Sequence, residues 1–282
     1  MTNILRISIF VLGLTAAVIA GCDRETPETD IYIGLDNGIA DGSFQDLMNL
    51  VAQQAAASGF DGLAAGTQNT RLDDCPTTTF SAPFGTFPNI MTIDFGESCV
   101  GYLGLERSGK VIATFTGPYA EAGTLVTITT DNYFVNGNKV EGVKTIYNEG
   151  FNDDGNPYFS INVTGGLITL ASGDSISWSA SRIREWIGGF GTPEIEDDVY
   201  ALTDGIAVDH AVEGINRSGI PFTGHIVQPL IRELDCRWMV SGVIEITPEG
   251  LEVRSIDYGS GACDNIATLS VGEFITEITL PY

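Results

Sequence analysis

Short runs of alternating apolar and polar residues fill the chain from Ile90 onward, and turn residues separate one run from the next. Such alternation is typical of β-strands that have one buried and one solvated face. The segment 175–181 alternates throughout and places Ile176, Trp178 and Ala180 on a single face. The same criterion predicts strands over residues 111–116, 125–134, 139–147, 158–163, 167–170, 199–208, 238–246, 251–256 and 273–280.

About a dozen strands of this kind predict an all-β fold, an antiparallel meander over residues 75–282. So many strands must form a curled sheet, a sandwich or a partly closed barrel. The pair Asn136-Gly137 lies between two runs and predicts a tight hairpin, because both central positions of a type I′ turn need positive φ. The β region is either one domain or two unequal halves that meet near residues 188–197.

One segment has helical rather than strand periodicity. Apolar residues recur from Phe44 to Ala55 at the spacing of one helical face, with Ser43 as N-cap and Gly59 as the C-terminal stop. We therefore expect a single short helix over residues 43–59.

Residues 1–21 have the pattern of a lipoprotein signal peptide. An apolar run over residues 7–20 follows Arg6 and ends in Ile19-Ala20-Gly21-Cys22, which resembles a bacterial lipobox. The run is shorter than the roughly 20 residues that span a bilayer. The resemblance implies cleavage before Cys22, a diacylglycerol on its sulfur and a further acyl chain such as palmitate on its amine, which together give a stable anchor. The alternative is an ordinary signal peptide that happens to meet a cysteine.

Residues 22–42 are acidic, are interrupted by Pro27 and show no periodicity, so we expect a flexible tether there. The protein is then exported and held to the membrane by its N-terminal lipid. Acidic residues after the lipidated cysteine resemble a signal for the cell surface in some Gram-negative groups, whereas Asp23 beside Cys22 resembles an inner-membrane retention signal in others. We favour the outer membrane and its cell-surface face.

Four further cysteines belong to a weak internal repeat. Residues 93–99 read Ile-Asp-Phe-Gly-Glu-Ser-Cys, and residues 256–263 read Ile-Asp-Tyr-Gly-Ser-Gly-Ala-Cys, with one inserted residue. An even number of cysteines in an exported protein predicts disulfides. An earlier cysteine precedes each copy, so of the three connectivities the repeat favours Cys75–Cys99 and Cys236–Cys263. No pair has the short spacing of zinc sites.

The charge excludes some partners. The chain carries 37 Asp and Glu against 13 Lys and Arg, a net charge of −24, which argues against nucleic acid and anionic lipid surfaces. His210 and His225 are the only imidazoles, and we expect His210 on a surface turn. The sequence has no nucleophile elbow, zincin helix or phosphate loop, which favours a non-enzymatic role without deciding it.

Two sets of polar residues are candidates for chemistry. The doublets 73–74, 153–154 and 197–198 are adjacent aspartates that suggest a glycosidase, but neighbours on a strand point to opposite faces and do not form a catalytic pair. Asp153, Asp154 and Asn156 belong to an oxygen-rich turn that offers a weak Ca²⁺ site, and an ordinary hairpin turn is the alternative. We expect no other cofactor.

The three tryptophans, Trp178, Trp186 and Trp238, form either a sugar-stacking platform or parts of the core.

Residues 93–99, 131–142 and 257–265 resemble segments of lipoproteins from Bacteroidota-type bacteria that have no established activity. The resemblance covers most of residues 75–282 and implies location and fold, but no catalytic residue. We expect a membrane-anchored envelope lipoprotein with a binding or structural role and a glycan or protein ligand. The alternatives are a carbohydrate-active envelope hydrolase that uses carboxylates, and an envelope-assembly protein that holds a lipid or precursor in a rolled sheet.

Overall fold

The computed structural model describes residues 27–60, 75–101, 104–192, 196–205 and 209–280. The described residues form one helix, α1 (Pro27–Ser58), and fifteen strands. The strands are β1 (Thr77–Phe80), β2 (Asn89–Asp94), β3 (Cys99–Val100), β4 (Glu106–Phe115), β5 (Leu125–Val135), β6 (Asn138–Phe151), β7 (Pro157–Thr169), β8 (Ser175–Gly188), β9 (Val199–Asp204), β10 (Val212–Ile215), β11 (Pro221–Glu233), β12 (Met239–Pro248), β13 (Arg254–Ser260), β14 (Ile266–Val271) and β15 (Phe274–Thr279).

All fifteen strands join one antiparallel sheet, which confirms the predicted all-β meander. The main path runs in chain order from β1 to β15, with β3 beside β4 and β9 bridging β8 and β11. Because β8 and β9 pair with each other, the sheet is not divided near residues 188–197. Asn136 and Gly137 both have positive φ, as the predicted tight hairpin between β5 and β6 requires.

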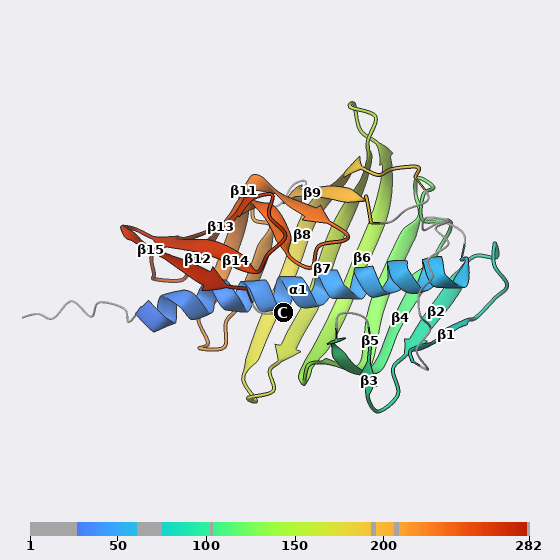
Figure 1. The fold of residues 1–282 in the computed structure, drawn as a ribbon, viewed down its shortest axis with the longest axis horizontal. Helices are drawn as coiled ribbons and strands as arrows, with labels where there is room; N and C mark the ends of the chain where they lie inside the picture. The colour runs from blue at the N-terminus through green and yellow to red at the C-terminus, as the bar shows by residue number, and fades with distance from the viewer. Residues whose placement is uncertain (1–26, 61–74, 102–103, 193–195, 206–208, 281–282) are drawn as a thin grey trace, which may run out of the picture.

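The sheet curls around the helix. In Figure 1, α1 lies across the strands β4 to β8, and the C-terminal strands β11 to β15 gather around its N-terminal part. The helix contacts strands as far apart in the sheet as β4 and β14. A single cluster of buried apolar side chains, contributed by the helix and both ends of the sheet, fills the space between them.

The helix begins at Pro27 rather than at Ser43, so the tether expected over residues 22–42 is wrong from Pro27 onward. The helical periodicity is weak there because the helix is buried on nearly every side, and polar as well as apolar positions face the sheet. Asp36, Asn37 and Asp41 are all almost fully buried. The segment predicted as a signal peptide, residues 1–21, and Cys22 lie outside the described residues. Among the described residues, no helix has the length and apolar character of a membrane span.

Three helix aspartates, spaced five residues apart, fasten α1 to the surrounding chain through arginines. Asp36 pairs with Arg217 at 2.5 Å, Asp41 with Arg182 at 2.8 Å and Asp46 with Arg107 at 2.8 Å. Buried ion pairs add little net stability, but removal of one partner leaves an uncompensated charge. These pairs therefore fix the position and rotation of the helix in the curl.

Phe44 packs tightly between the helix and the sheet. Its ring stacks on Trp178 with the centroids 5.5 Å apart. A Cβ at Gly166 would lie 2.9 Å from the Phe44 ring, and one at Gly142 would lie 3.1 Å from it. Both glycines are at irregularities of the β6–β7 pairing, so the absence of side chains makes the notch into which Phe44 fits.

Both predicted disulfides are confirmed. Cys75 is bonded to Cys99 and Cys236 to Cys263.

The sequence repeat also corresponds to a repeated local structure. In one copy the Asp94 carboxylate accepts the N–H of Gly96 at 2.9 Å, and in the other the Asp257 carboxylate accepts that of Gly259 at 2.8 Å. Gly96 and Gly259 both have positive φ. The two copies are thus the same turn, each next to a disulfide, at opposite ends of one sheet.

Candidate functional site

The curl brings the two repeat copies to opposite sides of a cleft of about 120 Å³, which we call the repeat cleft. Phe95 of the first copy and Tyr258 of the second occupy the same place in the repeat, and both line it. Each disulfide also contributes, through Pro76 next to Cys75 on one side and through Cys236 on the other. The cleft is therefore formed where the two disulfide-bonded ends of the sheet meet over the helix.

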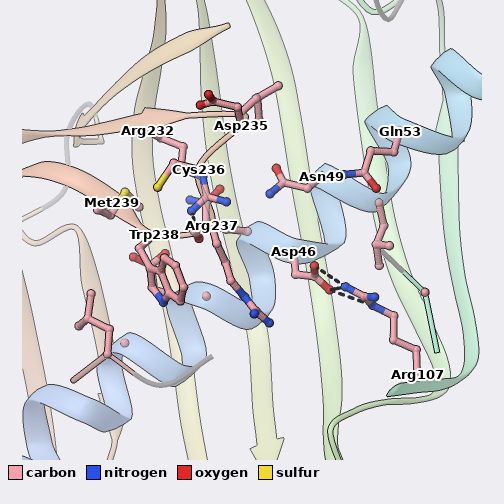
Figure 2. A pocket seen from close by; sticks show the side chains of 18 of the residues that line it. Asp46, Asn49, Gln53, Arg107, Arg232, Asp235, Cys236, Arg237, Trp238 and Met239 are labelled. Carbon is pink, nitrogen blue, oxygen red and sulfur yellow. Dashed lines mark hydrogen bonds and ion pairs between the residues drawn. The ribbon is translucent and has the colours of Figure 1, made fainter. Parts of the chain in front are cut away.

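The floor of the repeat cleft is the polar side of α1. Gln45, Asp46, Asn49 and Gln53 line it, and Figure 2 shows Asp46, Asn49 and Gln53 across the cleft from the loop that carries Arg237. Gly42 lies on the same floor, and a Cβ placed there would meet nothing within 4 Å. The helix thus offers amide donors and acceptors to the cleft and leaves space between them.

Three arginines reach the repeat cleft: Arg107, Arg232 and Arg237. Arg107 donates two hydrogen bonds to Asp46 from one nitrogen, at 2.8 and 3.0 Å, and Tyr133 donates a further one to the same carboxylate at 3.2 Å. The Arg237 guanidinium lies 5.6 Å from the centroid of the Trp238 ring. Cationic and aromatic groups therefore occur together on the walls.

This concentration of cations is unusual for so acidic a chain. Six of the ten lysines and arginines among the described residues are buried: Arg107, Lys144, Arg182, Arg184, Arg232 and Arg254. Most of the positive charge of the described residues is therefore buried, and acidic side chains dominate their surface.

Trp238 is the tryptophan that faces the repeat cleft. Its indole N–H is shielded from solvent and has no hydrogen-bond acceptor among the described residues. A buried donor without an acceptor is costly and uncommon in native proteins, so this N–H requires a partner that the described residues do not supply. Trp178 and Trp186 are buried core residues instead, so the three tryptophans do not form one platform.

A second cavity of about 30 Å³ adjoins the repeat cleft, and we call it the Arg184 chamber. Gln45, Asn49, Arg232 and Leu234 line both spaces, so the two lie side by side along the helix. The volume is enough for about one or two water-sized groups.

Burial controls the electrostatics of the Arg184 chamber. It raises the pKa of the Asp198 carboxyl to about 7, an effect that hydrogen bonds from Trp186 and Tyr200 only partly oppose. The Trp186 indole N–H donates to Asp198 at 3.1 Å. Burial also lowers the pKa of Arg184 and raises that of Tyr200. Asp198 is therefore a carboxyl that titrates near neutral pH beside a buried guanidinium.

The carboxylate doublets have different environments. Asp73 and Asp74 lie outside the described residues. Asp153 and Asp154 are exposed in the β6–β7 hairpin turn, whereas Asp198, beside the exposed Asp197, lines the Arg184 chamber. The sequence placed the 197–198 doublet among three equal candidates, and only its burial singles out Asp198.

The turn considered for Ca²⁺ is closed by its own hydrogen bonds. The side-chain oxygen of Asn152 accepts the N–H of Asp154 at 3.1 Å and that of Asn156 at 2.9 Å, and the Asn156 amide donates to Glu185 at 2.8 Å. Within the described ranges no three His, Cys, Asp or Glu side chains are grouped as metal ligands would be. The weak Ca²⁺ site stays a prediction.

The histidines and a further groove lie away from both cavities. His210 pairs with Glu213 at 3.2 Å and His225 with Asp204 at 3.1 Å. A groove of about 730 Å³ is lined mainly by glycine, serine, threonine and proline, with Glu213 among its few charged residues. No protein-family model, curated protein or solved structure matches the chain.

Proposed function

We propose that this protein is a lipid-anchored envelope protein that binds a saccharide-like polar ligand in the repeat cleft. The observation that carries the proposal is the convergence of both disulfide-bonded repeat copies on one cleft that exposes amides, arginines and an aromatic ring. A rigid frame around a small number of aimed polar groups is what ligand sites require.

The lining groups suit a sugar ring. Trp238 offers an aromatic face and a buried N–H without an acceptor among the described residues. Asn49, Gln45 and Gln53 offer amides that both donate to and accept from hydroxyl groups. Arg237 adds a cation that bonds to an acidic substituent. An aromatic body with polar groups around it combines stacking with directional hydrogen bonds.

Neither alternative function fits the cleft as well. Three carboxylates line the cleft. Asp41 and Asp46 are each held by an arginine at 2.8 Å. Only the exposed Asp235 is left, so the cleft does not present two available carboxyl groups for glycoside hydrolysis. The concave face of the sheet is filled by α1, and charged groups surround the space that remains. A lipid tail would bury those charges without partners, which is strongly unfavourable.

Calorimetric titration with galacturonate, and with galactose as the neutral parent, tests the ligand proposal. We expect saturable binding of one sugar molecule per protein. Trp238→Ala and Arg237→Gln should each lower the affinity about tenfold or more, which is the usual effect of removing a side chain at the centre of a binding site. Lys110→Gln is the matched control, because Lys110 pairs with Asp94 on the surface and lines neither cavity. If neither sugar binds, or the cleft variants bind as tightly as Lys110→Gln, the cleft is not a saccharide site.

The anchor is a separate part of the proposal and has its own test. Asp23 to Thr26 are the residues between Cys22 and the start of α1, so a lipid on Cys22 would hold the helix within roughly 18 Å of the bilayer surface. Labelled palmitate is expected in the wild-type protein and not in Cys22→Ala. Protease added to intact cells should remove the domain if it lies on the cell surface. Label retained by Cys22→Ala contradicts the anchor, and protection until lysis contradicts the surface location.

A further inference from the structure

Arg184 is a buried cation without a carboxylate at ion-pair distance among the described residues. Its side chain is 6% exposed, and its Nε–H has no hydrogen-bond acceptor in the same part of the chain. By contrast, the helix aspartates pair with Arg107, Arg182 and Arg217. Buried charges are normally paired, because an isolated one is very costly in a medium of low polarity.

Aromatic rings replace a counter-ion around Arg184. Its guanidinium carbon lies 4.6 Å from the centroid of Tyr200, 4.8 Å from that of Phe159 and 5.9 Å from that of Tyr119. One terminal nitrogen donates to the Tyr119 hydroxyl. Ring faces attract a cation but do not neutralise it. The only carboxyl in the described lining of the chamber is Asp198, whose pKa is raised to about 7, so below that pH the guanidinium has no ionised partner there.

We propose that the Arg184 chamber is a subsite for one carboxylate group of the ligand, with Arg184 as the counter-ion. The inference deepens the proposed function and rests on it, because it makes the ligand an acidic saccharide. The planar guanidinium matches a carboxylate. The chamber volume of about 30 Å³ suits a carboxylate better than the bulkier tetrahedral phosphate. The shared lining residues Asn49 and Arg232 place this subsite next to the sugar in the repeat cleft.

Asp198 makes the subsite sensitive to pH. The charged and titratable groups around it are Arg184 of β8, Tyr200 of β9, Arg232 of β11 and the neighbouring Asp197. The helix presents only Gln45, Met48, Asn49 and Ala52 to the chamber, and none of these titrates. Below the Asp198 pKa of about 7 the carboxyl is neutral and can donate a hydrogen bond to a bound carboxylate. Above it, the new negative charge repels the anion, so affinity falls with rising pH by up to about tenfold per pH unit.

The test measures binding of acetate, inorganic phosphate, galacturonate and galactose by calorimetry at pH 6 and pH 8. The wild type is expected to bind acetate and galacturonate at pH 6, and to bind both about tenfold more weakly at pH 8. At pH 6, the affinity of Arg184→Gln for both ligands should be at least tenfold lower than that of the wild type. At pH 8, Asp198→Asn should bind acetate with the affinity that the wild type has at pH 6. This variant keeps the test decisive if Arg184→Gln does not fold. Lys110→Gln is the control for loss of one positive charge.

The outcomes separate this inference from the proposed function. Galactose binding that is retained in Arg184→Gln, with no binding of acetate by the wild type, refutes the subsite and leaves the saccharide cleft. Acetate binding without any sugar binding refutes the saccharide cleft and leaves the anion subsite. Tighter binding of phosphate than of acetate contradicts the carboxylate assignment. Equal affinity of the wild type for acetate at pH 6 and pH 8 contradicts the role of Asp198 in the subsite.

Discussion

Lys144 should limit the stability of this protein at neutral and acidic pH. The side chain is 2% exposed beneath the helix, and its ammonium group donates to the backbone oxygen of Phe44 at 2.9 Å. Burial lowers the pKa of Lys144 from 10.5 to about 7; Arg182 and Arg232 lower it further and Asp41 opposes them. A buried ammonium therefore stays charged only at a cost to the folded state.

The magnitude follows from the difference between the pKa values in the unfolded and folded states. A change from 10.5 to about 7 corresponds to about 5 kcal/mol of disfavour for the charged form. Between these two pH values the unfolded chain binds more protons than the folded one, so stability rises with pH. Below about pH 7 the full penalty applies. Lys144→Met removes it but also removes one hydrogen bond, which contributes about 1 kcal/mol.

Denaturant unfolding at pH 6, 7.5, 9 and 10 measures the effect. At pH 6 we expect Lys144→Met to be more stable than the wild type by about 4 kcal/mol, and the difference should shrink as pH approaches 10. Lys139→Met is the matched control, since Lys139 lies in the same strand but is partly exposed and pairs with Glu141. It should change stability by less than about 0.5 kcal/mol. Parallel pH profiles for wild type and Lys144→Met would refute the reasoning.

Three further changes test the packing of the helix and the contribution of one disulfide. Gly42→Ala should stabilise the protein by about 0.5–1 kcal/mol in thermal unfolding, because a helical glycine gains a methyl group in open space; a lower melting temperature contradicts this. Gly166→Ala should destabilise it by about 1–3 kcal/mol, because the new Cβ would lie 2.3 Å from the backbone oxygen of Trp178 and 2.9 Å from the Phe44 ring. Unchanged stability would show that the strand and the ring can both move aside. Replacing Cys236 and Cys263 together by serine should lower stability by about 3–4 kcal/mol, since the disulfide closes a loop with a sequence separation of 27. Equal denaturant midpoints for the wild type and the double variant would contradict this expectation.

Local signals predicted the strands and hairpins well. Segment 175–181 alternates because one face of β8 packs on the core, and Ile176, Trp178 and Ala180 are indeed buried. The repeat predicted the disulfides correctly because each copy brings its own pair of cysteines. β11 was missed because its proline and glutamine break the alternation, and the structure has register shifts there.

The helix start and the site depend on contacts between residues far apart in the chain. Asp36 and Asp41 look like tether residues in the sequence, but both are buried in the helix and paired, Asp36 with Arg217 of the β10–β11 turn and Asp41 with Arg182 of β8. Nothing local indicates that both repeat copies face one cleft, since the curl of the whole sheet brings them together. Arg184 gave no sequence signal, because its environment is made by rings from several elements.

The most direct test of the repeat cleft as a ligand site is calorimetric binding of galacturonate to the wild type, Gly42→Leu and Gly42→Ala at pH 6. Leucine at position 42 would project from the helix floor into the cleft, whereas alanine adds a single carbon. We predict one saturable site in the wild type and Gly42→Ala, and at least tenfold weaker binding in Gly42→Leu with its circular dichroism spectrum unchanged. Equal affinity in all three proteins, or no binding in any of them, would contradict the account.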